Sequence, residues 1–176
     1  MRIEPWTPAL AARNAELVAA IEARRGGALY NLDRMLLWSE PLARGWNTYL
    51  RALRQEISLS PFMRELAICV VARLTGAEYE YHHHAPELKK AGATDTQLGA
   101  LADPDAAAAS DHFDKLQRAV IRFAIASTRN VKVPNSIFDE LKQRMSATEI
   151  VELVAVTAAY NMVARFLVAL QVTPET

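Results

Sequence analysis

Residues 59–98 of this 176-residue chain read LSPFMRELAICVVARLTGAEYEYHHHAPELKKAGATDTQL, and they carry its clearest structural signals. Ser60 followed by Pro61 is typical of a helix start, because serine caps the first turn and proline is tolerated at the first helical position. The helix that begins there and runs to Gly76 is apolar nearly all round in its middle, which is typical of a buried helix. A further helix is expected at residues 77–91. This segment therefore predicts a central buried helix with a second helix directly after it.

Helix signals continue along the rest of the chain, and no segment shows a convincing strand pattern. Proline starts and capping boxes predict the remaining helices at residues 8–25, 28–39, 41–55, 94–101, 111–128, 134–145 and 147–170. Residues 102–110 are expected to form a loop, and residues 130–133 a linker. The length fits one domain spanning residues 1–176. We therefore expect a single all-α domain.

The composition narrows the possible partners. Twenty Lys and Arg residues balance twenty Asp and Glu residues, for a formal net charge of +0. Binding to nucleic acid or to an anionic membrane needs a clustered basic excess, so neither partner is expected. The N-terminus lacks the layout of a signal peptide, no charge-free run of about 18 apolar residues occurs, and one cysteine cannot form an internal disulfide or a CxxC redox pair. These features predict a cytoplasmic protein without a membrane span.

The histidine run at residues 82–84 contains one pair with the spacing of an acid–base unit. Because a helix turns once in about 3.6 residues, Glu80 and His84 lie one turn apart on the same face, whereas His82 points away. A histidine held by a carboxylate is a common proton-transfer unit. The three histidines cannot converge on one point from a regular helix, so a metal cage of three histidines is excluded.

The sequence contains only part of the pattern that a metal site would need. Glu80 and His83 match the Glu-x-x-His element of helical di-iron sites, but such sites need a second copy of the element and further glutamates, which the sequence lacks. The usual zinc pattern of two histidines four residues apart with a third ligand is also missing. We therefore expect neither a metal nor another cofactor.

Glu65 is the other carboxylate with a possible chemical role. It begins a strongly apolar helix, and its face, continued through Cys69 and Ala72, is expected to be buried. A buried carboxylate needs a partner such as a histidine, an arginine or a water molecule. The alternative is that Glu65 forms ordinary ion pairs with Arg64 and Arg73 at a helix end, and the spacing leaves both possibilities open.

The central segment and the C-terminal helix together resemble a known family. The pattern is R-E-L, an apolar helix, G-x-E-Y-E-x-x-x-H and A-G-x-[TS]-D, followed later by LQRAVIRFA and EIVELVAVTAAYNMVARFLVAL. It is similar to the carboxymuconolactone decarboxylase family, also called alkylhydroperoxidase AhpD-like, over a core at about residues 30–172 that follows an N-terminal helical extension at residues 1–27. The resemblance implies an AhpD-like helical bundle that assembles as a homo-oligomer (dimer, trimer or hexamer), with sites near the subunit interfaces.

One branch of the family, the peroxidases, carries a C-x-x-C-x-x-x-H motif with a relay glutamate. In this chain Ala77 occupies the position of the first thiol and Glu80 that of the second, while His84 and Glu65 occupy the histidine and relay positions. Cys69 lies in an apolar helix and is interpreted as an inert core thiol. A thiol peroxidase mechanism is therefore disfavoured.

The decarboxylase branch is similar to this chain in carrying glutamate at the second thiol position. That resemblance implies three catalytic residues, with His84 as proton donor or acceptor, Glu80 orienting it and Glu65 tuning it. Three further residues are candidates for binding the substrate: Arg73, His83 and Tyr79. Arg64 is a further candidate for holding a substrate carboxylate.

These observations predict a cofactor-independent, decarboxylase-like enzyme that acts on a small lactone or organic acid by Glu/His acid–base chemistry. Two alternatives remain. The first is a peroxidase-like or metal-assisted oxidoreductase without the thiol pair, which Glu80 and His83 would support. The second is a non-catalytic family member, a helical oligomer with a degenerate pocket.

Overall fold

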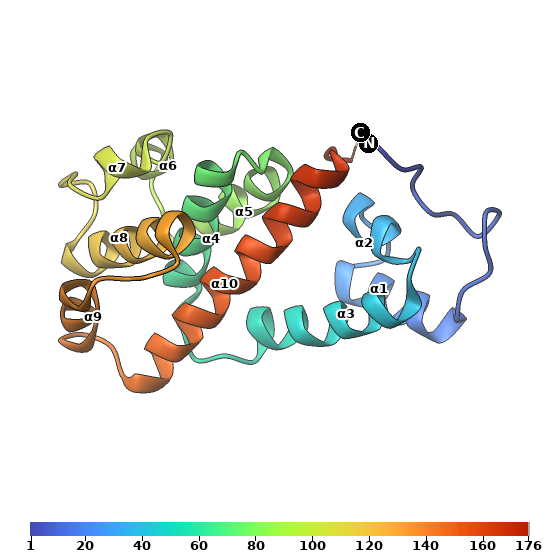
Figure 1. Cartoon of the computed structure of the whole chain (residues 1–176), viewed down its shortest axis with the longest axis horizontal. Coiled ribbons are helices and arrows are strands. Elements are labelled where there is room, and N and C mark those ends of the chain that lie inside the picture. Colours follow the sequence, from blue (N-terminus) through green and yellow to red (C-terminus); the bar gives the residue numbers. More distant parts are fainter. Residues whose placement is uncertain (176) are drawn as a thin grey trace. The chain divides into compact units, whose positions relative to one another are not determined.

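The computed structural model describes residues 1–175, which form ten helices and no strand (Figure 1). The helices are α1 (Ala15–Arg25), α2 (Asn31–Leu36), α3 (Glu40–Gln55), α4 (Pro61–Thr75), α5 (Glu78–Lys90), α6 (Asp95–Ala100), α7 (Pro104–Ala107), α8 (Lys115–Asn130), α9 (Asn135–Lys142) and α10 (Ala147–Leu170). The expected all-α class is confirmed.

The chain divides into two compact units. The first consists of Met1–Ile57 with the C-terminal residues from Ala169 on, and the second of Ser58–Val168. The first unit contains α1, α2 and α3, and the second contains α4 to α9 with nearly all of α10. The expectation of a single domain over residues 1–176 stays a prediction.

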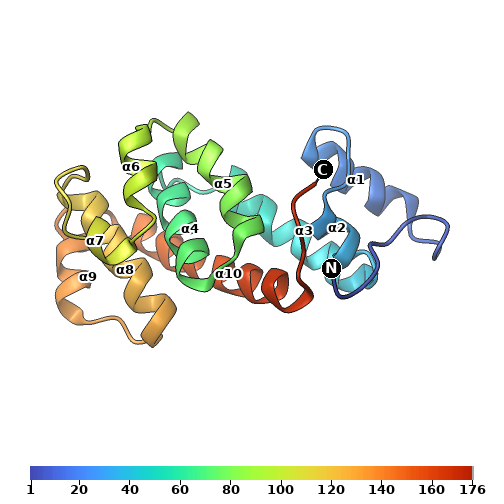
Figure 2. The same ribbon diagram turned by 90° about the horizontal axis from the view of Figure 1, so that it is seen from above.

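The second unit is built around α4. Seven consecutive residues from Leu66 to Ala72 are buried, so α4 has no solvent-facing side in its middle. It packs against α5 on one side and α8 on the other (Figure 2). The side chain of Ser60 accepts a hydrogen bond from the backbone N–H of Met63, as the capping prediction requires. The sequence therefore predicted both the start of this central helix and its burial.

A glycine makes the sharp turn between α4 and α5. Gly76 has φ +66°, a left-handed conformation that costs little only without a Cβ atom. Its N–H and that of Ala77 both bond to the carbonyl of Ala72, which closes the end of α4. The turn brings α5 back along α4, so residues from both helices share one buried interface.

Several boundaries differ from the predictions: α2 is shorter at both ends than the predicted range 28–39, α9 ends at Lys142, and three further differences have a local cause. The first helix begins at Ala15 and not near Pro8, because Asn14 caps it through the N–H of Leu17. The predicted loop at residues 102–110 contains the short helix α7. The following helix begins at Lys115 and not at residue 111, since Asp114 and Gln117 form a capping box there.

The first unit is held together by a buried carboxylate. Asp33 on α2 is 1% exposed and forms salt bridges with Arg24 and Arg25 at the end of α1. Arg24 also donates to the side chain of Asn47 on α3. A charge this deep needs such partners, so this network is a structural feature that ties three helices together.

Among residues 1–175, α10 is the one helix whose length and composition would allow it to cross a membrane. Its mean hydropathy reaches 1.8 over 18 residues, and 44% of that window is buried inside the protein. Core helices of globular proteins have the same properties, so this is a weak indication of a membrane span. Buried residues such as Leu153, Tyr160 and Leu167 show that α10 contributes one face to the core.

Candidate active site

A buried carboxylate–imidazole pair links α4 to α5. Glu65 on α4 is 1% exposed and His84 on α5 is 6% exposed. The Nδ1 atom of His84 lies 2.6 Å from Oε2 of Glu65, and Nε of Arg64 donates to Oε1 of Glu65 at 3.0 Å. Both oxygens of Glu65 are therefore engaged, one by an imidazole and one by a guanidinium.

The surroundings of Glu65 keep it ionised. Burial on its own raises the pKa of this carboxyl, but the hydrogen bond and charge of His84, followed by the charge and hydrogen bond of Arg64, outweigh burial and lower the pKa below its ordinary value. An ionised Glu65 can only accept, so the proton of the bond lies on Nδ1 of His84. Nε2 is then the atom at which His84 can take up or release a proton.

A third residue, Tyr160 on α10, contacts the histidine of this pair. Its ring meets that of His84 edge to face, with centroids 4.9 Å apart and an interplanar angle of 86°. Tyr160 is itself buried, so it fixes the orientation of the imidazole ring from the side of a third helix. Tyr160 was not among the predicted site residues, because no local pattern links a tyrosine in a core helix to a histidine 76 positions earlier.

Glu80 does not form the pair with His84 that its spacing suggested. It lies one turn before His84 on α5 and is 2% exposed, yet neither of its carboxylate oxygens has a hydrogen-bond partner among the described residues. Burial raises the pKa of Glu80 well above its ordinary value. The surroundings thus shift the two glutamates in opposite directions, toward the ionised form for Glu65 and toward the neutral form for Glu80.

The candidate substrate-binding residues lie on the same two helices, Arg73 on α4 and both Tyr79 and His83 on α5. The guanidinium of Arg73 stacks over the ring of Tyr81, with Cζ 3.4 Å from the centroid, and its Nε is buried without a hydrogen-bond partner in the part of the chain described. Tyr79 is buried and its ring lies 4.5 Å from that of His83. His82 is exposed, as the helical geometry predicted. The binding roles of Arg73, His83 and Tyr79 stay predictions.

Cys69 lies in the same interface, one turn after Glu65 on α4. It is fully buried, and its thiol pKa is raised first by burial and then by the charge of Glu65, against a smaller opposite effect of Arg73. A thiol in this state is a poor nucleophile. Ala77, at the position of the first peroxidase thiol, is also buried.

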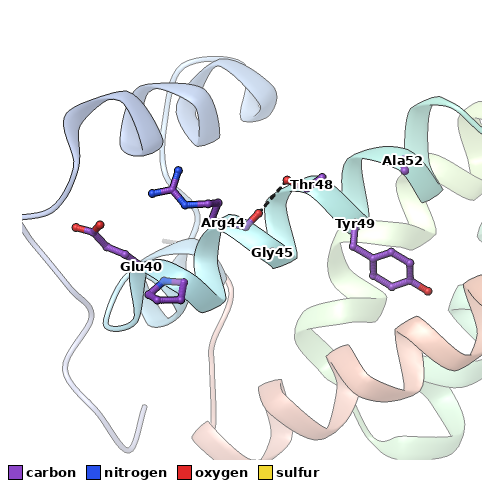
Figure 3. A pocket seen from close by; sticks show the side chains of 7 residues that line it. Glu40, Arg44, Gly45, Thr48, Tyr49 and Ala52 are labelled. Carbon is purple, nitrogen blue, oxygen red and sulfur yellow. Dashed lines mark hydrogen bonds between the residues drawn. The ribbon is translucent and has the colours of Figure 1, made fainter.

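The described residues offer no metal site, and a surface groove is lined by none of the predicted site residues. Within residues 1–175 no group of three or more metal-ligating side chains is close enough to hold a metal ion. A groove of about 760 Å³ runs along α3 in the first unit (Figure 3), and its lining residues are Glu40, Pro41, Arg44, Gly45, Thr48, Tyr49 and Ala52. The hydroxyl of Thr48 donates to the carbonyl of Arg44 within the helix. The groove contains none of the predicted site residues.

Comparisons with known proteins give a family match for the central part of the chain and similar folds for nearly all of it. Residues 40–126 match the sequence model of the carboxymuconolactone decarboxylase family. No curated protein sequence matches the chain. The matched residues include Glu65, Glu80 and His84, so the predicted resemblance is confirmed for the segment that carries the candidate site.

Solved structures with the same fold cover nearly the whole chain. An uncharacterised peroxidase-related protein from Ralstonia eutropha JMP134, described as an alkylhydroperoxidase AhpD core, has a TM-score of 0.83 at 17% identity over 99% of this chain and 92% of its own. A similar peroxidase-related protein from Silicibacter sp. TM1040 has a TM-score of 0.79 at 17% identity, over 99% of this chain and 95% of its own. A variant of the debrominase Bmp8 in complex with 2,3,4-tribromopyrrole has a TM-score of 0.79 at 18% identity, over 100% of this chain and 92% of its own. At these identities the similarity shows an AhpD-like fold and does not transfer an activity.

Proposed function

We propose that this chain, whose residues 40–126 match the carboxymuconolactone decarboxylase family, is a cofactor-independent lyase that decarboxylates a small lactone or organic acid. The observation that carries the proposal is the buried contact between Glu65 and His84, 2.6 Å long and held by Arg64 and Tyr160. Such a pair positions a histidine for proton transfer and sets its tautomer.

The reaction requires a proton donor close to the carbon atom that loses CO₂. When the carbon–carboxylate bond breaks, CO₂ leaves and the electron pair moves into the rest of the substrate, giving an enolate or dienolate. A protonated His84 then delivers the proton on Nε2 to the carbanionic carbon, and water restores that proton. Glu65 stays ionised and stabilises the imidazolium, so it supports the histidine without exchanging a proton itself.

The substrate carboxylate needs a cation that does not neutralise Glu65. Arg73 supports this role, because its guanidinium stacks on Tyr81 and leaves a buried Nε without a hydrogen bond among the described residues. His83 and Tyr79, which contact each other, are proposed to line the same binding region. We also propose that the enzyme acts in the cytoplasm as a homo-oligomer.

A peroxidase-like reaction is the second candidate, since two structural neighbours are described as peroxidase-related. The side chains present argue against a thiol route. Ala77 and Glu80 supply no sulfur, and Cys69 is buried with a raised thiol pKa. A family member without catalytic activity is the third possibility.

The test is to incubate the protein with a panel of carboxylated lactones and organic acids and to measure CO₂ release. For any substrate that reacts, His84→Gln and Glu65→Gln should each lower kcat by about a hundredfold or more. Glu78→Gln is the matched control, because Glu78 lies exposed on the same helix. Unchanged turnover in His84→Gln would sink the acid–base assignment. Peroxide reduction with a dithiol at a rate above background would favour the second candidate.

A further inference from the structure

The most unusual group in the site is Glu80. Its carboxyl lies within the interface of α4 and α5, 2% exposed, with both oxygens unpartnered among the described residues. Building on the proposed function, we infer that Glu80 is a neutral carboxylic acid whose O–H donates to the substrate oxygen that becomes negatively charged as CO₂ leaves. This assigns it a role in stabilising an oxyanion, not in orienting His84.

The neighbouring charged groups are already occupied. On α4, Arg64 donates to Glu65, and Arg73 is held over the ring of Tyr81. On α5, His84 is engaged with Glu65 through Nδ1. None of these contacts reaches Glu80, so an ionised Glu80 would be a buried charge without a partner, which is strongly unfavourable.

Cys69 supplies no charge that would stabilise an ionised Glu80. It faces the same interface from α4, and burial is the largest cause that raises the pKa of its thiol, so the thiol stays neutral. Two carboxyls kept in opposite states by their surroundings are a recurrent arrangement in sites that combine proton transfer with hydrogen-bond donation.

A neutral acid suits the charge changes of decarboxylation. In the ground state the negative charge is on the departing carboxylate, and in the transition state it moves toward the carbonyl or ring oxygen. An O–H group aimed at that oxygen gains strength as the charge develops, whereas an ionised carboxylate would repel it. Glu80 keeps its proton throughout, and the proton added to carbon comes from His84.

The protonation state can be measured without any substrate. Infrared difference spectra of the wild type minus Glu80→Gln at pH 7 should show the carbonyl stretch of a protonated carboxylic acid. The spectrum of the wild type minus Glu78→Gln should show only the bands of an ionised carboxylate, because Glu78 is exposed on the same helix. A Glu80 spectrum with only carboxylate bands at pH 7 would overturn the inference, even if turnover depends on His84.

Donation to an oxyanion can be tested with substituted phenols of decreasing phenol pKa as probes. We expect the wild type to bind the phenolates more tightly than neutral phenols of the same size. Glu80→Gln keeps a donor and should retain most of this preference, whereas Glu80→Met should weaken phenolate binding by about ten- to a hundredfold.

Equal phenolate binding by the wild type and Glu80→Met, or no binding of any phenolate to the wild type, would contradict the role of Glu80. These results do not depend on turnover, so they are distinct from failure of the proposed reaction. If no acid or lactone is decarboxylated but the infrared band and phenolate preference are found, the proposed function fails and Glu80 remains an oxyanion donor.

Discussion

The contact between Glu65 and His84 makes the stability of the protein depend on two residues and on pH. Their side chains are 2% and 8% exposed, so removal of either partner leaves the other buried without its counterpart. Breaking such a pair typically costs about 3–5 kcal/mol. We therefore expect Glu65→Gln to lower the free energy of unfolding at pH 7 by an amount in this range, measured by urea titration. Glu78→Gln should change it little.

The pH dependence of that effect follows from the lowered pKa of Glu65. A carboxyl with a lowered pKa in the folded state stabilises the protein above its unfolded value of 4.5, and the stabilisation is lost as the pH falls through the folded pKa. The difference between the wild type and Glu65→Gln should therefore shrink as the pH falls below 4.5. A difference that stayed constant to lower pH would show that Glu65 does not titrate in this way.

Glu80 should have the opposite effect on stability. Because the pKa of Glu80 is raised in the folded protein, its carboxyl lowers the free energy of unfolding as the pH rises above the unfolded pKa of 4.5. Below that pH the carboxyl is neutral in both states and has no such effect. We expect Glu80→Met, which replaces an unpartnered carboxyl with an apolar chain of similar size, to stabilise the protein by about 1–3 kcal/mol at pH 7. The gain, followed as Tm against pH, should grow from pH 4 to pH 7. A lower Tm for Glu80→Met at pH 7 would indicate that Glu80 is paired.

Sequence reasoning identified Glu65 and His84 as residues with chemical roles, because a buried carboxylate must have a partner and a family pattern pointed to both. The resemblance implied that Glu65 tunes His84, but the residues alone left the partner of Glu65 open. The helical spacing favoured Glu80 as the partner of His84, but an i,i+4 spacing only makes contact possible. The turn at Gly76 places Glu65 of the neighbouring helix nearer to the imidazole, and that is a property of packing.

Among the helices, the C-terminal end of α8 stores backbone strain. Val131, which follows it, has φ +63° and ψ −48°, and the N–H of Lys132 bonds back to the carbonyl of Asn130 at 2.6 Å. This is a tight three-residue turn with positive φ, a rare and strained conformation for a β-branched residue. The side chain is 83% exposed, so packing does not compensate for the strain.

Val131→Gly is therefore expected to stabilise the protein, since it removes the Cβ atom that makes this conformation costly. Relief of strain, less the greater chain entropy of glycine in the unfolded state, gives a net gain of about 1 kcal/mol. Thermal unfolding measures it. Val131→Ala is the matched control, because it keeps the Cβ atom and should gain much less. Equal effects of both substitutions would show that the turn is not strained.

The helix starts show how well short sequence patterns predict where a helix begins. The capping boxes at Thr94 and Ser146 form as predicted, because each depends only on residues three positions apart. The start predicted at Pro8 is wrong although its signal is equally local. Trp6 is buried there and its indole N–H bonds to the carbonyl of Ala11, so tertiary packing holds this segment in a non-helical turn.

At the scale of the whole molecule, the fold was more predictable than the function. The AhpD-like neighbours share only 17–18% identity with this chain, yet they cover almost all of it. A buried apolar helix, a glycine turn and helix caps are features that many different sequences can provide, so one architecture is compatible with low identity. The reaction depends instead on a handful of side chains, and two of the decisive positions, Ala77 and Glu80, differ from the thiol pattern.

Association between copies of the chain is the remaining property of the whole molecule, and α10 offers a surface for it. Its buried face includes Tyr160, whereas three large apolar side chains on its opposite side are exposed: Val151, Val154 and Met162. Residues three, four, seven and eleven apart share a helix face, so these three form one stripe with Ala158 between them. A continuous apolar stripe is a common feature of interfaces between protein chains.

We therefore expect the wild type to form a homo-oligomer that is weakened by Met162→Glu or Val151→Glu, each of which places a charge in the stripe. Light scattering coupled to size-exclusion chromatography gives the mass of the particle. Val131→Glu is the control, because Val131 is also apolar and exposed but lies on a turn outside α10. A wild type that is monomeric at all concentrations, or a stripe variant of unchanged mass, would rule out this interface. Because α10 also holds Tyr160 against His84, dissociation should loosen the imidazole and lower turnover as the protein is diluted.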